Sequence, residues 1–172
     1  MLSVTNLKVS LKVLPICLDT VCSNAEISQT NFKRYNNFVV IQDNFTYIIF
    51  KNKIGFNTHV NITKIKKFED IEESKTYFSE KFLTCLNSKI ISHKIDNITA
   101  SYDLKKTINI FQVIEKFKDI CEVRYNNETF PGVFLKHKLG TIIVFHSGKT
   151  IIIGSKDLSK LQCLIQFLTA NI

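Results

Sequence analysis

The stretch from Thr129 to Lys156 restricts the fold of this chain more than any other part of the sequence. It contains two apolar runs, Val133–Lys136 and Thr141–Phe145, and a Ser-Gly-Lys turn that leads into a third run, Thr150–Ile153. Runs rich in β-branched residues and separated by short turns predict a three-stranded antiparallel meander. The last two runs are apolar on both faces, whereas a strand with one face in water alternates apolar and polar residues. The second face must therefore be covered, either by another layer of the same protein or by a partner.

The first half of the chain repeats the spacing of this stretch. Phe130 and Phe145 are 15 positions apart, and so are Tyr35 and Phe50. In both halves, an apolar strand and a turn lie between the two aromatic residues. A shared spacing of this kind indicates two copies of one unit.

Two asparagines extend the repeat to the beginning of each half. Asn6 stands in Thr-Asn-Leu and Asn97 in Asp-Asn-Ile, 91 residues apart, against 95 residues for the aromatic pairs. One insertion of four residues explains the difference. The sequence therefore predicts one compact duplicated domain, with a first repeat at 1–88 and a second at 89–172, which is long enough to bury a core.

Both halves show the same order of predicted elements. In the first half these are a strand over 4–14, a short helix over 16–25, strands near 35–41, 45–51 and 53–60 and a helix over 68–87; in the second, a strand over 89–103, a helix over 108–121, the meander and a helix over 158–169. Apolar residues recur every three to four positions in the longer helices, as expected for packing on a sheet. This order predicts an α+β fold of two β-α-β-β-β-α repeats, with helices on one sheet face only.

Strand alternation indicates which side chains share the uncovered face, because residues i and i+2 point to the same side. If Phe145 faces outward, Ile143 does too, while Ile142 and Val144 face the helices. The corresponding outward candidates on the next strand and in the first half are Ile151, Ile153, Ile48 and Phe50. Ordinary core packing is the alternative interpretation for each of them.

Charge and hydropathy leave two classes of surface open. The chain has 23 basic and 15 acidic residues, a net charge of +8. Such a balance is typical of nucleic-acid binders and equally of a solvated lysine surface. No apolar run reaches the 18 residues of a membrane span, and Lys8 and Lys12 interrupt the first residues, unlike in a signal peptide. We therefore expect an intracellular protein.

The sequence carries none of the patterns that indicate catalysis. The four histidines are scattered, no Cys or His pair has zinc-ligand spacing, and neither a phosphate-binding glycine loop nor a nucleophile elbow is present. The five cysteines are odd in number and lack Cys-x-x-Cys spacing, so reduced thiols are expected. We expect a binding protein rather than an enzyme, without metal or cofactor.

Four short segments resemble one known family. They are Phe130-Pro131-Gly132, Ile143-Val144-Phe145, Ser147-Gly148-Lys149 and Gly154-Ser155-Lys156, and they are similar to the second half of the TATA-box-binding protein core. Through the internal repeat the resemblance covers nearly the whole chain. It implies a pseudo-twofold saddle, made of one curved antiparallel sheet with helices on its convex face. Its concave face would lie in the minor groove of AT-rich double-stranded DNA and bend the duplex.

The resemblance assigns the aromatic residues to two wedges. Phe130 and Phe145 correspond to the second wedge pair, and Tyr35 and Phe50 to the first. Each pair would insert between two base steps, which favours the easily deformed steps of AT-rich sites.

Other residues would contact bases and phosphates. Asn6 and Asn97 correspond to two asparagines that bond base acceptors at the centre of the site, where A·T pairs show A N3 and T O2. The basic positions that would reach phosphates are Arg34, Lys136 and Lys149. Further positions on the DNA-facing surface are Pro131, Ile143, Ile151, Ile48 and Thr99.

The sequence departs from the family pattern mainly in its first half. Tyr35 replaces a phenylalanine, and the segment Lys51–Val60 has neither the Ser-Gly-Lys turn nor Gly-Ala-Lys. Ile153 replaces a threonine of the second half, while Lys8 and Thr99 replace apolar floor residues. These departures predict relaxed or altered sequence choice, with asymmetric binding through the second half.

The resemblance also implies partners. The family presents bent DNA to transcription factors IIB and IIA and to the RNA polymerase machinery, in the nucleus or another transcription compartment. Glu128 corresponds to one glutamate of an acidic pair that serves as a partner contact, although a simple turn residue is the alternative. A second hypothesis is a protein-interaction relative that has lost DNA binding and sequesters general transcription factors.

Overall fold

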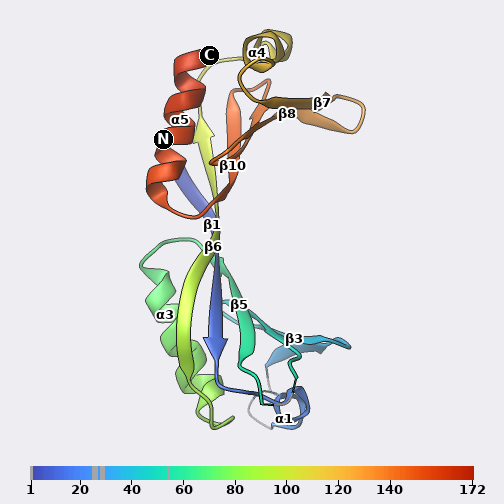
Figure 1. Cartoon of the computed structure of the whole chain (residues 1–172), viewed down its shortest axis with the longest axis vertical. Coiled ribbons are helices and arrows are strands. Elements are labelled where there is room, and N and C mark those ends of the chain that lie inside the picture. Colours follow the sequence, from blue (N-terminus) through green and yellow to red (C-terminus); the bar gives the residue numbers. More distant parts are fainter. Residues whose placement is uncertain (1, 25–26, 28–29, 54) are drawn as a thin grey trace. The chain divides into compact units, whose positions relative to one another are not determined.

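The computed structural model describes residues 2–24, 27, 30–53 and 55–172 (Figure 1). The chain forms two compact units. The first unit is Asn6–Asp96, and the second unit combines Asn97–Ile172 with the residues that precede Asn6. The unit boundaries fall inside two long strands, β1 (Leu2–Val13) and β6 (Ile90–Asp103), so each of these strands contributes to both units. The units therefore differ from the sequence repeats predicted at 1–88 and 89–172. The first residues of β1 belong to the second unit, and the first residues of β6 belong to the first unit.

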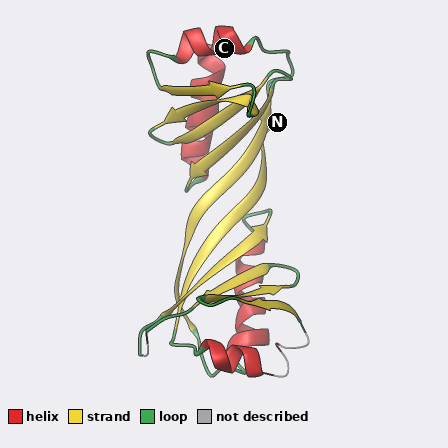
Figure 2. Ribbon diagram, turned by 90° about the vertical axis from the view of Figure 1, so that its right-hand side faces the viewer, coloured by secondary structure: helices red, strands yellow, loops and turns green. Residues whose placement is uncertain are grey.

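In the first unit, the strands follow the hydrogen-bonded order β2-β3-β4-β5-β1-β6. The elements not yet given are β2 (Asn31–Arg34), β3 (Phe38–Gln42), β4 (Thr46–Phe50), β5 (Thr58–Ile65), the helices α1 (Leu18–Ser23) and α3 (Asp70–Phe78), and the π-helical turn η1 (Ser79–Leu83). Figures 1 and 2 show α3 along one face of these strands.

The core of the first unit lies between the sheet and α3–η1. Alternate strand residues are fully buried there, among them Val39, Ile41, Ile49, Val60 and Ile62. The ring of Tyr47 lies 4.7 Å from that of Phe78 and 5.6 Å from that of Phe82, between centroids. Its buried hydroxyl donates to the Ser74 carbonyl at 3.0 Å, which satisfies the polar group. Burial raises the pKa of Tyr47 above its ordinary value.

In the second unit, the strand order is β1-β6-β10-β9-β8-β7. Its other elements are α4 (Ile110–Phe117), β7 (Glu122–Asn126), β8 (Phe130–His137), β9 (Gly140–Phe145), β10 (Lys149–Ser155) and α5 (Leu158–Asn171). The side chains of Asn109 and Asp157 cap α4 and α5 by accepting backbone N–H groups of the first turn. Helix α5 packs its buried leucines Leu161, Leu164 and Leu168 against β9 and β10.

Each repeat has one strand more than the β-α-β-β-β-α order predicts. The additional strands, β2 and β7, pair only with β3 and β8 among the described strands, so they are edge strands. Their sequences, Asn-Phe-Lys-Arg and Glu-Val-Arg-Tyr-Asn, are largely polar because an edge strand keeps much of its surface in water. A search for apolar runs therefore misses them.

Other boundaries also differ from the predicted ones. The strand predicted near 53–60 is β5 and runs to Ile65, and the helix predicted over 68–87 is α3 followed by η1. The helix predicted over 108–121 is the shorter α4, because Asn109 caps it and Lys118 ends it. The helix predicted over 16–25 spans Leu18–Ser23, and residue 25 lies outside the described residues.

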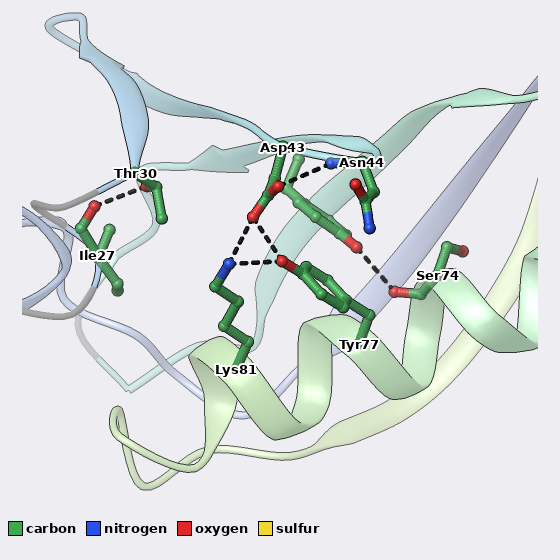
Figure 3. Close-up of polar contacts among 8 residues, drawn as sticks. Ile27, Thr30, Asp43, Asn44, Ser74, Tyr77 and Lys81 are labelled. Atoms are coloured by element: carbon green, nitrogen blue, oxygen red, sulfur yellow. Dashed lines mark hydrogen bonds and ion pairs between the residues drawn. The ribbon is translucent and has the colours of Figure 1, made fainter.

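A polar cluster of Asp43, Tyr77 and Lys81 links the β3–β4 turn to α3 and η1 by hydrogen bonds (Figure 3). Asp43 accepts hydrogen bonds from the Tyr77 hydroxyl at 2.5 Å and from Lys81 Nζ at 2.6 Å. These bonds to Lys81 and Tyr77 hold the pKa of the Asp43 carboxyl below its ordinary value, although burial opposes them.

We expect Asp43→Asn to lower the free energy of unfolding by about 1 kcal/mol near pH 7. Because the folded-state pKa of Asp43 is lowered, its contribution is complete above the unfolded-state value of about 4 and is lost as the pH falls further. Thermal melts between about pH 3 and 7 should therefore converge for wild type and variant at the acid end. The exposed carboxylate Asp119, changed to Asn, is the control and should leave the melting curve unchanged; parallel curves for Asp43→Asn would contradict the assignment.

Candidate nucleic-acid interface

Each unit has a sheet face opposite its long helix, which we call the open face (Figure 2). In the first unit, Phe38 pairs with Phe50 and Val40 with Ile48, and all four are half-buried. In the second unit, Phe134 pairs with Ile143, which pairs with Ile151. The residues between them in sequence, such as Ile142 and Val144, are fully buried toward the helices, as strand alternation predicts.

Three phenylalanine rings gather at one end of the open face in the second unit. Phe130 is 36% exposed, and its ring centroid lies 5.2 Å from that of Phe134 and 5.6 Å from that of Phe145. Gly132, directly opposite Phe145, makes this possible, because a Cβ there would lie 2.8 Å from Phe130 Cε1 and 3.0 Å from Phe145 Cε1. The predicted residues Phe130 and Phe145 are thus brought together, with exposed Pro131 beside them. Phe134 was missed by the sequence pattern.

The first unit has a row of three rings in a different arrangement. Tyr35, 46% exposed, stacks on Phe38 at 4.5 Å, and Phe38 lies 5.9 Å from Phe50. Phe38 is paired with Phe50 at the place where Gly132 is paired with Phe145. The predicted pair Tyr35 and Phe50 is therefore linked through Phe38, a residue to which sequence reasoning gave no role.

Asn6 and Asn97 make equivalent contacts in their own units. Asn6 Oδ1 accepts the backbone N–H of Lys64 at 3.2 Å, and Asn97 Oδ1 accepts that of Gly154 at 2.8 Å. A backbone N–H can only donate, so each amide turns its oxygen toward the backbone and presents its NH₂ group as a donor. Asn97 Nδ2 donates to Thr99 Oγ1 at 3.2 Å and keeps its second hydrogen available.

The same contact identifies Lys64 as the counterpart of Gly154. Both residues have left-handed backbone conformations, with φ of 67° and 85°, at positions where the strand register shifts. From the sequence, Lys51–Val60 is predicted as the counterpart of the segment that ends in Gly154-Ser155-Lys156. The structure moves the end of this counterpart to Lys64, because β5 continues to Ile65 and its left-handed residue is Lys64.

The floor of the open face differs between the units. In the first unit, Asn61 lies between Ile48 and Ser10 on the neighbouring strands. In the second unit, Ile151 lies between Ile143 and Ser101 in the same way. An amide therefore stands in one unit where the other has an aliphatic side chain.

A charged group adjoins the polar part of this floor. The Ser10 hydroxyl lies 2.9 Å from Asn61 Oδ1 and also donates to the Asp96 carboxylate. Lys8 and Lys94 pair with the same carboxylate at 3.7 and 3.3 Å. Burial disfavours the charged form, but the Ser10 and Lys94 hydrogen bonds hold the pKa of Asp96 below its ordinary value. Lys8 thus forms an ion pair with Asp96 beside the floor.

Arg34 does not share the open face. It is paired with Val39, whose side chain faces the helices, and its guanidinium forms an ion pair with Asp19 at 2.5 Å. The resemblance placed Arg34 against phosphates, but the register gives that side to Lys33, which is paired with Val40.

Cations flank the ring cluster of the second unit. Lys136 pairs with Glu122 at 3.2 Å, and Glu122 also holds Arg124. The hydrogen bond from Lys136, and after it the one from Arg124, holds the pKa of the Glu122 carboxyl below its ordinary value. Arg124 is paired with Phe134 on the open face, which sequence reasoning did not predict, and Lys149 is exposed at the start of β10.

The predicted partner contact, Glu128, lies in the exposed turn between β7 and β8. Its backbone N–H donates to Asn126 Oδ1 at 3.0 Å, so the residue also has a role in the turn. Within the described residues, no group of three or more His, Cys, Asp or Glu side chains could hold a metal ion. No helix in the described part of the chain is long and apolar enough to cross a membrane.

Sequence comparisons find similar proteins for less than half of the chain. Residues 92–172 match the family described as transcription factor TFIID (or TATA-binding protein, TBP). The TATA-box-binding protein of Thermococcus sibiricus is 35% identical over 75 residues, which are 42% of this chain and 38% of that protein. TATA-box-binding protein-like 1 of Entamoeba histolytica is 32% identical over 78 residues, 44% of this chain and 35% of its own length.

The solved structure of Methanococcus jannaschii TBP is similar over a far longer stretch. It matches with a TM-score of 0.80 over 99% of this chain and 97% of its own, at 21% identity. The sequence matches thus span less than two fifths of those two relatives' own lengths, whereas the fold is shared along nearly the whole chain.

Proposed function

We propose that the chain, which resembles TATA-box-binding proteins in the sequence of its second half and in its fold, is a DNA-binding transcription initiation factor that bends AT-rich DNA from the minor groove. The observation that carries the proposal is the cluster of Phe130, Phe134 and Phe145 on the open face. An exposed ring cluster in a soluble protein marks a binding surface, and rings partly free of packing can be driven between base steps.

The polar groups of the open face fit the same ligand. The outward NH₂ groups of Asn6 and Asn97 match the acceptors N3 of adenine and O2 of thymine. The cations Lys33, Arg124, Lys136 and Lys149 lie on or beside the open face, where phosphates would run. Glu122 already binds two of them, so DNA would compete with that carboxylate for Arg124 and Lys136.

The family supplies the rest of the proposal. Bent DNA would be presented to factors similar to transcription factors IIB and IIA and to RNA polymerase, with Glu128 in its exposed turn as one contact. A second candidate function is a protein-docking relative without DNA binding. The charged floor of the first unit, formed by Lys8 and Asp96, favours it, because an apolar groove floor is replaced there by an ion pair.

A short AT-rich duplex labelled at both ends for energy transfer tests the two candidates. Titration with the protein should shorten the end-to-end distance, and a GC-rich duplex should respond only at higher concentration. If the four cations contact phosphates, log K against log salt should have a slope of about −3 to −4. Absence of binding, or weak binding that neither shortens the duplex nor depends on salt, would favour the protein-docking function.

A further inference from the structure

Asn61 is a floor residue at which the two units differ in hydrogen-bonding capacity, and its amide is held by a side chain, that of Ser10, rather than by a backbone group. It lies on the open face of β5, paired with Ile48 on one side and with Ser10 on the other. Ile151 has the equivalent place in the second unit. The internal repeat therefore provides a matched apolar reference for this single side chain.

The amide of Asn61 is held differently from those of Asn6 and Asn97. A backbone N–H fixes each of the latter with its NH₂ group outward, so they offer donors. The partner of Asn61 is the Ser10 hydroxyl at 2.9 Å, which can donate or accept. The Asn61 amide can therefore turn over and present its oxygen without losing a bond to Ser10.

Asp96 makes this turnover favourable. A hydroxyl has one proton, and the Asp96 carboxylate, which also contacts Ser10, is a stronger acceptor than an amide oxygen. When Ser10 donates to Asp96, its oxygen is free to accept from Asn61 Nδ2. The oxygen of Asn61 is then available on the open face as a hydrogen-bond acceptor.

In the minor groove, guanine alone presents a donor, its N2 amino group. An aliphatic side chain leaves that donor unpaired and desolvated, which disfavours G·C pairs. We propose that Asn61 accepts guanine N2–H, so that the first unit takes a G·C pair which the second unit, with Ile151, rejects. This inference rests on the proposed binding to the minor groove.

One consequence is a direction of binding. On a near-palindromic AT-rich site, the two orientations of a pseudo-symmetric protein are close in energy. A single G·C pair in either half would place the first unit over that half. Two G·C pairs at symmetry-related positions would force one of them beneath Ile151.

The test compares three duplexes, with binding measured by energy transfer. They are an AT-rich palindromic parent, the same duplex with one G·C pair, and the same duplex with two symmetry-related G·C pairs. The G·C position is varied from the centre outward in a series of such duplexes. At one position, wild type should bind the single-G·C duplex within about threefold of the parent and the double-G·C duplex about ten- to a hundredfold more weakly. Asn61→Ile should already reject the single-G·C duplex. Ile151→Asn should accept both.

Asn61→Ala removes the amide oxygen without adding bulk, and it serves as a second variant in case Asn61→Ile does not fold. It should also bind the single-G·C duplex more weakly than the parent. Thermal melts check that all variants are folded. Equal discrimination by wild type and Asn61→Ala at every position would overturn the inference while leaving DNA bending intact. Failure of wild type to bind the AT-rich parent would instead overturn the proposed function, and this inference with it.

Discussion

Phe130→Ala combined with Phe145→Ala is expected to abolish DNA bending and to weaken binding to AT-rich DNA by about 2–6 kcal/mol, at least thirtyfold in Kd. Each truncation removes a ring that would stack on a base, and both rings belong to the cluster of the second unit. Wedge insertion also supplies the contact that offsets unstacking, so without it the duplex should stay straight.

Stability should change far less than affinity in this double variant. Phe130 is 36% exposed and Phe145 is half-buried, so the loss is mainly that of ring contacts within the cluster, about 1–2 kcal/mol. Phe111→Ala is the matched control, because Phe111 is 70% exposed on α4 and away from the open face. Bending that survives in the double variant with a normal melting curve would show that the rings are not wedges.

Gly148→Ala is expected to cost about 4 kcal/mol of the free energy of unfolding, enough to unfold the second unit near 37 °C. Gly148 has φ of 80°, and a Cβ on it would lie 2.1 Å from the Lys106 carbonyl oxygen. That oxygen belongs to a backbone segment tied to the same turn, where Leu104 N–H donates to the Gly148 carbonyl at 3.0 Å and Ile108 N–H to that of His146 at 2.8 Å. The segment cannot move aside without breaking these bonds.

Gly55→Ala separates the clash from the backbone strain. Gly55 has a similar φ of 85°, but a Cβ on it would have no heavy atom within 4 Å among the described residues. It should cost only about 1 kcal/mol, the price of the left-handed conformation. Urea denaturation of both variants measures the difference in the free energy of unfolding. Equal losses would mean that the backbone at Lys106 moves away from the new Cβ and that there is no lasting clash.

The strand alternation of the second unit and the start of α5 follow directly from its sequence. Ile142 and Val144 are buried toward α5 while Phe145 lies half-buried on the open face, because a strand with period two places them so. Helix α5 begins at Leu158, as predicted, after the Asp157 cap. Strong apolar signals and short turns leave little freedom in this half.

The first unit was harder to predict because small shifts in register change the face of a side chain. Tyr35 lies three residues before the partner of Phe50, whereas Phe130 lies two residues before the partner of Phe145. Equal spacing along the sequence therefore conceals Phe38. By the same kind of shift, Arg34 turns to the helix side and Lys33 takes the open face.

Two further features left no usable sequence signal. The left-handed position of β5 holds Lys64, so the glycine that marks it in the second unit is missing. Asn61 lay just beyond the predicted end of its strand at residue 60, and a polar residue past a strand end looks like part of a loop. Only the strand pairing places it beside Ile48 and Ser10.

The sharing of β1 between the units bears on the order in which the protein can be built. Thr5 Oγ1 donates to the Thr99 carbonyl at 3.1 Å across 94 residues of sequence, and Thr5 belongs to the second unit although Asn6 belongs to the first. A ribosome releases residues 2–5 long before it has made their partners. The first unit can therefore close before residues 2–5 have met their partners, and the second unit is completed by a strand end that was synthesised long before the rest of it.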